Sequence, residues 1–333
     1  MNKRNHHKKA IVTGGAGFIG SHMVDLLISK GFIVIVIDNL VGGHKKNLAH
    51  HKKNKRLILK KIDINKINTE DKIFNNTKYI FHFAGLGDLI PSIENPEKYT
   101  KINTFGTIKM LELGRKLNVK KFVYAASASC YGKKSKKVSE NTKINLEHPY
   151  ALSKYLGEQA ALNWNKVYGL PVNSLRIFNA YGPRVRTTGA YGAVIGVFFK
   201  QKLSNNPLTI VGDGNQTRDF IHVKDVVSGF FLAAKTKLSG KVFNLGSAIP
   251  TKINLLANII GGSKIFIPNR PGEPRHSYAD NRFIKSKLNW KPKINFKIGI
   301  TEMLKDINKW KKAPLWTKQN IKLATKDWFK YLN

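Results

Sequence analysis

The sequence has 333 residues and a single cysteine, Cys130, so no intrachain disulfide can form. A small fold held together by disulfides is therefore excluded, and a reducing compartment is the simplest expectation. Long apolar runs are also absent, since none approaches the roughly 20 residues that span a bilayer. Residues 1–9 are basic but lack the apolar segment of a signal peptide. These absences predict a cytoplasmic protein with no membrane insertion.

Acidic residues are scarce: 20 Asp and Glu stand against 58 Lys and Arg, which gives a formal net charge of +38. Such a balance can indicate a nucleic-acid partner. Arginine is scarce as well, with 10 residues against 48 lysines. Phosphate-binding surfaces more often combine arginine with aromatic residues. We therefore interpret the lysines as solvated surface and predict no nucleic-acid partner.

The first half of the chain alternates between strand and helix patterns. Apolar runs predict strands at 10–13, 32–37, 57–62, 79–83, 122–127 and 172–178, and amphipathic patterns predict helices at 19–30, 96–117 and 150–168. This alternation is typical of an α/β fold, a Rossmann-type doubly wound parallel sheet, which we place at residues 1–178. Residues 179–333 are richer in Gly and Pro and predict a smaller α/β substrate-binding domain. Residues 221–245 are expected to return to the first domain as a helix and a strand.

A glycine-rich turn joins the first strand to the first helix. Gly14, Gly17 and Gly20 have the GxxGxxG spacing in which glycines permit a tight turn, close approach to a pyrophosphate and close helix packing. The helix N-terminus then presents free N–H groups to the phosphates. Asp38 ends the second strand, where a carboxylate accepts hydrogen bonds from ribose hydroxyls and repels a 2′-phosphate. The motif therefore predicts NAD rather than NADP as cofactor.

Tyr150 and Lys154 lie four residues apart and share one face at the start of a helix. A neighbouring ammonium and the helix dipole are expected to lower the tyrosine pKa from about 10, so that the phenolate can act as a base. Ser127 ends a predicted strand, where its hydroxyl would point into the ligand crevice. We predict Ser127, Tyr150 and Lys154 as the catalytic residues.

Taken together, these residues resemble the extended short-chain dehydrogenase/reductase family over about residues 9–310. The resemblance rests on the glycine turn, Asp38, an Asp63-Ile64 pair, the run at 82–86, Asn103 in an N-x-x-G-T run, the serine-rich strand and the Tyr150/Lys154 pair. It implies that NAD is contacted by the following residues: Gly14, Gly17, Phe18, Ile19, Gly20, Asp38, Asn39, Asp63, Ile64, Phe83, Ala84, Gly85, Asn103, Tyr150 and Lys154.

The downstream motifs resemble those of UDP-sugar 4-epimerases within this family. Asn179 in the run 176–184 and Arg218 in the run 212–225 match positions that contact the UDP, and Arg270, ten residues before Asp280, matches a second diphosphate arginine. Arginine suits that role because it makes bidentate, permanently charged contacts. Ser127 and Ser129 match positions beside the sugar.

Three departures from related enzymes refine the prediction. Sugar dehydratases and uronic-acid decarboxylases of this family carry an acid in the serine-rich strand, whereas this chain reads Ser127-Ala128-Ser129. Gly87 stands where the epimerases often have a lysine. Ser277 stands at a position where a bulky tyrosine excludes N-acetyl groups, so a small residue there favours N-acetylated sugars.

We therefore predict NAD-dependent 4-epimerisation of a UDP-hexose, either UDP-GlcNAc/UDP-GalNAc, UDP-Glc/UDP-Gal or the uronic acid forms. The alternatives are another nucleotide-sugar epimerase, a reductase, or a dehydratase or decarboxylase of the same family. A non-catalytic NAD- or nucleic-acid-binding protein is the alternative from another class. No metal site is expected. The resemblance also implies a homodimer through the helices at 96–117 and 150–168.

Overall fold

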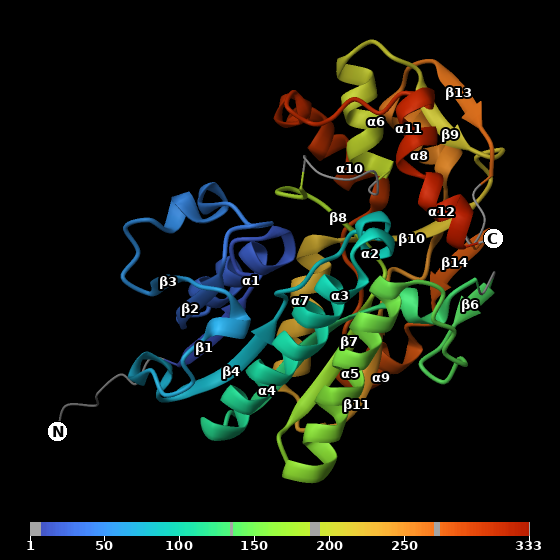
Figure 1. Cartoon of the computed structure of the whole chain (residues 1–333). Helices are drawn as coiled ribbons and strands as arrows, with labels where there is room; N and C mark the ends of the chain where they lie inside the picture. Colours follow the sequence, from blue (N-terminus) through green and yellow to red (C-terminus); the bar gives the residue numbers. More distant parts are fainter. Residues whose placement is uncertain (1–7, 134–135, 187–193, 270–273, 333) are drawn as a thin grey trace.

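The computed structural model describes residues 8–133, 136–186, 194–269 and 274–332. Its centre is a parallel sheet of seven strands (Figure 1). In spatial order these are β11 (Lys241–Leu245), β7 (Val172–Ile177), β5 (Lys121–Ser127), β4 (Thr77–His82), β1 (Lys9–Thr13), β2 (Ile33–Asp38) and β3 (Leu57–Lys61). The chain runs outward from β1 in both directions, so the prediction of a Rossmann-type α/β fold is confirmed.

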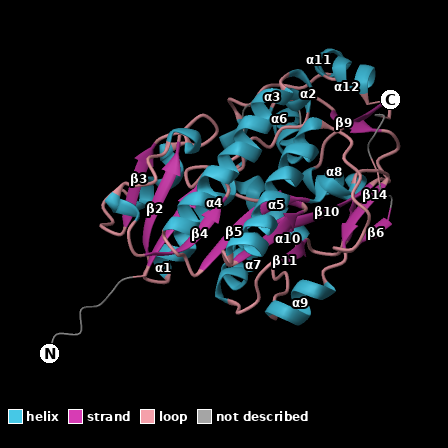
Figure 2. Ribbon diagram, turned by 60° about the horizontal axis from the view of Figure 1, so that its bottom comes forward, coloured by secondary structure: helices cyan, strands magenta, loops and turns pink. Residues whose placement is uncertain are grey.

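Alternating side chains of the strands bury both faces of this sheet. On β1, Val12 packs in the core that contains α1 (Phe18–Ser29), α7 (Val223–Lys235) and α9 (Arg282–Leu288). Ile11 points to the other face, into the core of α4 (Gly106–Lys116) and α5 (Pro149–Tyr168). This is the period-two alternation of a strand covered on both sides. With helices on both faces (Figure 2), the carboxyl ends of the strands are left to form a site.

Part of the sheet comes from late in the chain. α7 packs on one face, and β11 pairs in parallel with β7 from Lys241 beside Asn173 to Leu245 beside Ile177. The strand thus extends the edge of the sheet after the chain has passed through the second lobe.

The second lobe has a core of its own. Phe198, Phe199, Leu256, Ile300 and Trp310 are buried together. They come mainly from α6 (Val194–Leu203), α8 (Ile253–Ile260) and α10 (Phe296–Lys305), beside the pair β9 (Leu208–Val211) and β13 (Lys264–Ile267). α11 (Lys318–Ala324) and α12 (Lys326–Tyr331) complete the lobe (Figure 1).

A smaller sheet lies where the two lobes meet. It consists of β12 (Pro250–Lys252), β10 (Thr217–His222), β14 (His276–Ala279) and β6 (Lys136–Val138), and β8 (Asn179–Tyr181) also pairs with β10. These short strands bring segments from residues 136 to 279 to one side of the main sheet's carboxyl edge. None of the helices in the described ranges is long and apolar enough to cross a membrane.

The helix predicted at 96–117 is interrupted. The structure has α3 (Pro96–Thr100), a π-helical turn at Lys101–Phe105 and then α4. Asn103, inside the turn, directs its amide to Leu86 and Ser153 rather than to solvent. π-Turns of this kind often occur at functional sites, and this one lies behind the cavity described next.

Candidate active site

The carboxyl ends of β1, β2, β4, β5 and β7 open into a cavity of about 940 Å³ between the two lobes. It brings together nearly all of the residues predicted from the sequence. Those that line it are Gly14, Gly17, Phe18, Ile19, Gly20, Asp38, Asn39, Asp63, Ile64, Phe83, Ala84, Gly85, Ser127, Ser129, Tyr150, Lys154, Asn179, Arg218 and Ser277. Arg270 lies outside the described residues, and Asn103 does not line the cavity.

The glycine turn has no room for side chains. Gly14 has φ +65°, and a Cβ there would lie 2.8 Å from the backbone nitrogen of Ala84; a Cβ on Gly20 would lie 2.1 Å from the carbonyl oxygen of Gly14. α1 begins directly after Gly17 without a side-chain cap. Its first N–H groups can therefore bind the pyrophosphate of a dinucleotide.

Asp38 is held at the end of β2 with only 6% of its surface exposed. Its two oxygens accept hydrogen bonds from the backbone N–H groups of Ala16 (2.9 Å) and Leu40 (2.8 Å). A carboxylate has about four lone-pair sites, so it can still accept two ribose hydroxyls. Gly43 closes over it, because a Cβ there would meet the carboxylate at 2.7 Å. The turn and this fixed carboxylate together fit the adenosine half of NAD.

Asn103 supports the cavity wall from behind. It is fully buried. Its Oδ1 accepts from the Leu86 N–H at 2.8 Å, and its Nδ2 donates to the Leu86 carbonyl at 3.0 Å. A Cβ on Gly85 would lie 2.8 Å from this Oδ1. The residue therefore positions the segment 83–86 that lines the cavity.

His82 also supports the cavity wall, beneath the edge of the sheet. Burial lowers its pKa to about 3, so the ring is neutral. The Thr107 hydroxyl donates to the Asn103 carbonyl (2.6 Å) and so accepts from the His82 Nε2–H (3.0 Å), which leaves Nδ1 to accept the Thr13 hydroxyl (2.7 Å). This series of hydrogen bonds connects β1, β4 and α4 beneath the site.

Tyr150 and Lys154 lie in the first turns of α5 and face the end of β5, where Ser127 is placed. Burial raises the pKa of Tyr150, and a hydrogen bond with Ser127 acts in the opposite direction. Burial lowers the pKa of Lys154 to about 7. Its ammonium lies 4.5 Å from the centre of the Tyr124 ring. The three predicted catalytic side chains are thus adjacent in one buried corner.

The expected lowering of the tyrosine pKa is wrong for the protein alone. Both the phenol and the ammonium are removed from water, and desolvation disfavours the charged form of each. Burial is the largest cause of both pKa shifts.

The residues predicted to bind the substrate lie on the small sheet at the lobe junction. Asn179 donates from Nδ2 to the Asp219 carbonyl at 3.2 Å. Arg218 lines the cavity and donates from Nη1 to the carbonyls of Thr217 (2.9 Å) and Pro274 (2.8 Å). Ser277 is its direct neighbour in the parallel pairing of β10 and β14. The predicted diphosphate and sugar residues are therefore adjacent.

Several lining residues were not predicted. His148 could have been found, because it occupies the cap position before a predicted helix. The pair of Asp88 and Arg186, joined at 2.5 Å, and Trp328 and Leu332 from the C-terminal segment carry no local signal. Only the packing of α12 near α2 (Ile90–Glu94) brings the last two residues to the cavity.

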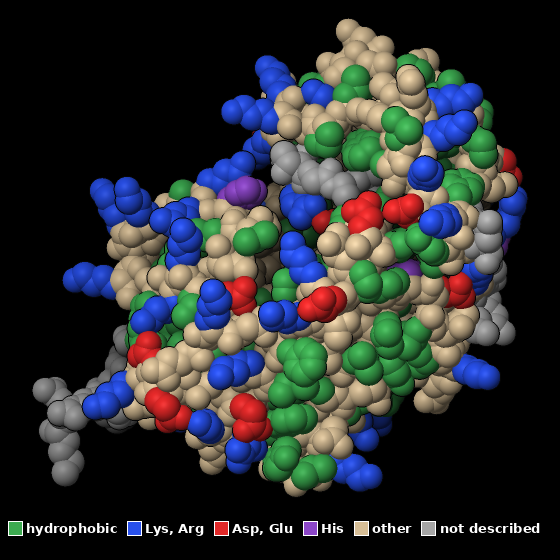
Figure 3. Space-filling view, in the orientation of Figure 1, with side chains coloured by type: hydrophobic (Ala, Val, Ile, Leu, Met, Phe, Trp, Pro, Cys, Tyr) green, Lys and Arg blue, Asp and Glu red, His purple; other side chains and the backbone are tan. Residues whose placement is uncertain are grey.

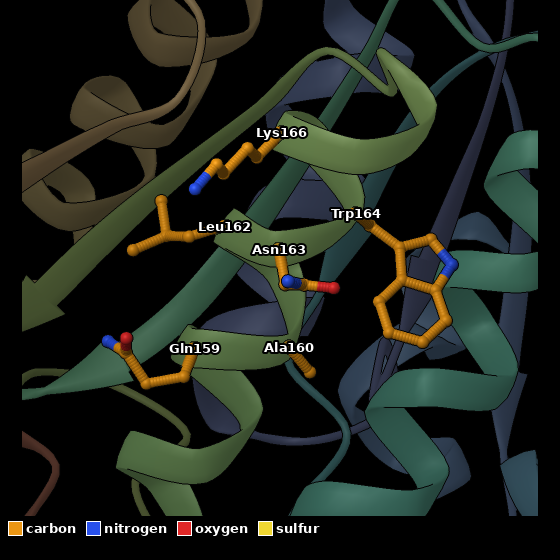
Figure 4. A pocket seen from close by; sticks show the side chains of 6 residues that line it. All are labelled: Gln159, Ala160, Leu162, Asn163, Trp164 and Lys166. Carbon is orange, nitrogen blue, oxygen red and sulfur yellow. The ribbon is translucent and has the colours of Figure 1, made fainter.

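Two other features lie outside this cavity. A hollow of about 460 Å³ on the outer side of α5 (Figure 4) is lined by Gln159, Ala160, Leu162, Asn163, Trp164 and Lys166. It holds one ionisable group and lies away from the strand ends. Asp25 accepts from Nε2 of His50 (2.7 Å) and His51 (2.9 Å) and pairs with Arg184 (2.8 Å). Because its charge is already paired, we interpret this cluster as a link between α1, the 3-10 helix Lys45–His51 and the segment that carries Arg184.

Comparisons with known proteins agree with this geometry. Residues 10–246 match the NAD dependent epimerase/dehydratase family. The chain is 39% identical over 303 residues to a Methanocaldococcus jannaschii protein named "Putative UDP-glucose 4-epimerase", covering 88% of this chain and 96% of that protein. It is 33% identical over 310 residues to UDP-glucuronic acid decarboxylase 1 of Arabidopsis thaliana, covering 90% and 69%.

A solved structure is similar over nearly its whole length. It is the UDP-N-acetylglucosamine 4-epimerase of Methanobrevibacter ruminantium M1 in complex with UDP-N-acetylmuramic acid. The TM-score is 0.85 at 32% identity, and the match covers 91% of this chain and 98% of that one.

Proposed function

Because the chain belongs to the NAD dependent epimerase/dehydratase family, we propose that this NAD-dependent enzyme interconverts the C4 epimers of a UDP-hexose. The observation that carries the proposal is the convergence of Ser127, Tyr150 and Lys154 on the cavity that also holds the glycine turn and Asp38. A base, a hydride carrier and a nucleotide-sugar site in one cavity are what reversible oxidation at a sugar carbon requires.

In the proposed mechanism Tyr150 takes the proton of the sugar C4 hydroxyl, and Ser127 hydrogen-bonds the reacting oxygen. NAD, which the glycine turn and Asp38 would hold, would supply the hydride acceptor and, once reduced, the donor, and its positive charge would favour the Tyr150 phenolate. Lys154 adds a second positive charge beside Tyr150. The 4-keto sugar turns about its diphosphate linkage while Asn179, Arg218 and Arg270 hold the UDP. Return of the hydride to the opposite face of C4 then gives the epimer, and Tyr150 returns the proton to the C4 oxygen.

The carboxylates near Tyr150 are engaged elsewhere, which favours epimerisation over loss of a group. Asp88 is paired with Arg186 at 2.5 Å. Glu147 accepts from Nδ2 of Asn145 at 2.5 Å. The strand end at Ser127–Ser129 has hydroxyls where an eliminating or decarboxylating enzyme of the family has an acid. Similarity to a decarboxylase makes decarboxylation the second candidate.

For the sugar, Ser277 supports an N-acetylated substrate, because a small side chain beside Arg218 leaves space for an acetamido group. The similar solved enzyme is named for UDP-N-acetylglucosamine. UDP-GlcNAc/UDP-GalNAc is therefore the first substrate pair, followed by UDP-Glc/UDP-Gal and the uronic acids. We propose that the enzyme is located in the cytoplasm, where it could bind nucleotide sugars without their export.

A homodimer is part of the proposal. Phe105, Leu152, Leu156, Val167 and Tyr168 are 38–60% exposed although all are apolar. They belong to α5 and the turn before α4, and Figure 3 shows apolar side chains gathered over these helices. We define these five residues as the α4–α5 patch. Contiguous apolar surface of this kind marks protein contacts, and a second copy would cover it.

Proton NMR of the purified protein with UDP-GlcNAc, and separately with UDP-Glc and UDP-glucuronic acid, tests the reaction without added reductant. The expected result is an equilibrium mixture of gluco and galacto isomers. Tyr150→Phe should lower turnover by about 10³-fold or more, since it removes the general base. Release of CO₂ from UDP-glucuronic acid would overturn epimerisation in favour of decarboxylation, and loss of the C6 hydroxyl signals would indicate dehydration.

A further inference from the structure

His148 lies in the cavity wall next to the proposed base. It is the N-cap of α5, and its Nδ1 accepts a hydrogen bond from the Ala151 N–H at 3.2 Å. Its ring is parallel to the Tyr150 ring, with centroids 5.9 Å apart and an angle of 6° between the planes. The imidazole is therefore held both at one edge and on one face.

This arrangement determines where the ring proton is. Nδ1 accepts a hydrogen bond and so carries no hydrogen. Burial lowers the pKa of His148 to about 4, so the ring is neutral at physiological pH. The single ring hydrogen is then on Nε2. No protein group within the described ranges accepts a hydrogen bond from this Nε2, so the donor is left for a ligand in the cavity that the residue lines.

We propose that the Nε2–H of His148 donates a hydrogen bond to an oxygen on the hexose, beside the carbon that reacts at Tyr150. This proposal rests on the proposed function. A hydroxyl, a carboxylate and an acetamido carbonyl all offer a suitable acceptor. Asn179 and Arg218 come from β8 and β10 and face the UDP, whereas His148 lies on the helix of the proposed base. Binding of the sugar should depend on His148, and binding of UDP alone should not.

A polar residue at a helix N-cap also stabilises the helix, so the test separates capping from binding. His148→Ser keeps a side-chain acceptor for the Ala151 N–H and removes Nε2–H. His148→Ala removes both. Each is made in a Tyr150→Phe background, which keeps the stacked ring and prevents turnover. Calorimetry of the NAD-loaded proteins then gives Kd for UDP, UDP-GlcNAc, UDP-Glc and UDP-glucuronic acid.

In His148→Ser we expect Kd for the best-binding UDP-sugar to rise about tenfold, the value of one neutral hydrogen bond, with Kd for UDP and the melting temperature unchanged. His148→Ala should show the same rise together with a lower melting temperature. Unchanged UDP-sugar binding in His148→Ser, with epimerisation intact in the wild type, would overturn this contact alone and leave His148 as a helix cap. A parent protein that binds UDP but none of the three UDP-sugars would overturn the proposed function as well.

Discussion

Burial of Lys154, a proposed catalytic residue, lowers the free energy of unfolding. Burial leaves only 8% of it exposed and lowers its pKa from 10.5 to about 7. Between these two values the unfolded chain binds a proton that the folded chain does not. Protonation therefore favours unfolding, and this cost is fully present below pH 7 and disappears as the pH approaches 10.5.

Lys154→Met should therefore stabilise the NAD-free protein while abolishing epimerisation. At pH 7 we expect the free energy of unfolding to rise on the order of 2–4 kcal/mol. The gain should shrink as the pH is raised from 7 to 10, which urea denaturation at several pH values would measure. A gain that did not change with pH would show that desolvation of the ammonium is not its cause.

The prediction that the enzyme uses NAD rather than NADP depends on Asp38. Asp38→Asn should weaken NAD binding about tenfold and reduce discrimination against NADP, because the amide keeps the shape but loses the charge that repels a 2′-phosphate. Fluorescence titration with both reduced cofactors would measure this. Asp71→Asn is a matched control, since Asp71 also accepts a hydrogen bond from the backbone N–H two residues on, that of Ile73, but pairs with Lys60 at 3.0 Å and does not line the cavity. Equal NADPH affinity in wild type and Asp38→Asn would contradict the assignment.

At the scale of secondary-structure elements, a buried ion pair joins β7 to α5 beside the proposed catalytic residues. Arg176 on β7 donates from Nη2 to Glu158 on α5 at 2.6 Å, and their side chains are 6% and 1% exposed. Arg176 also donates from Nη1 to the Tyr131 hydroxyl at 2.9 Å, next to the serine-rich strand end. This pair keeps α5 in a fixed position relative to Ser127.

Glu158→Gln should lower the free energy of unfolding by about 3 kcal/mol, because it leaves the buried guanidinium without its counter-charge. The matched control is Glu112→Gln, which removes an exposed partner of Arg115 (2.8 Å, side chains 30% and 44% exposed) and should cost less than about 1 kcal/mol. Chemical denaturation of both variants measures the difference. Similar losses in the two would mean that burial does not control the strength of these pairs.

At the scale of the whole molecule, the charge and the apolar surface are distributed differently. Lysine and arginine side chains are spread over the face seen in Figure 3, whereas the apolar side chains gather over α4 and α5. A spread charge keeps the protein soluble and attracts anionic substrates without forming a binding site. A gathered apolar surface instead favours contact with another protein, which is the basis of the proposed dimer.

The double variant Leu156→Glu, Val167→Glu should convert the proposed dimer to a monomer, since it places charges in the α4–α5 patch. Light scattering after size-exclusion chromatography would measure the mass, with wild type near 75 kDa as twice the 37.5 kDa chain. Ile298→Glu is the control, because Ile298 is 59% exposed on α10 in the other lobe. A wild-type protein of 37.5 kDa at micromolar concentration would contradict the dimer.

Features that depend on local spacing could be predicted from the sequence. The glycine turn, Asp38 and the Tyr150/Lys154 pair are each defined within a few residues, because a turn, a strand end or one helix face sets their geometry. The alternation of strands and helices predicted the parallel sheet for the same reason. The break in the helix at 101–105 could not be predicted, since it depends on the contacts of Asn103 with Leu86 and Ser153.

The sequence by itself therefore determined the fold class, the cofactor turn and the identity of the proposed catalytic groups, all of which arise from neighbours along the chain. Only the tertiary structure decided the ionisation of Tyr150 and Lys154, since desolvation depends on what packs around them. It also decided that His148, the Asp88–Arg186 pair and Trp328 border the same cavity. These residues come together because β5, α5 and the second lobe meet at the carboxyl edge of the sheet, a contact between segments that are distant in the chain.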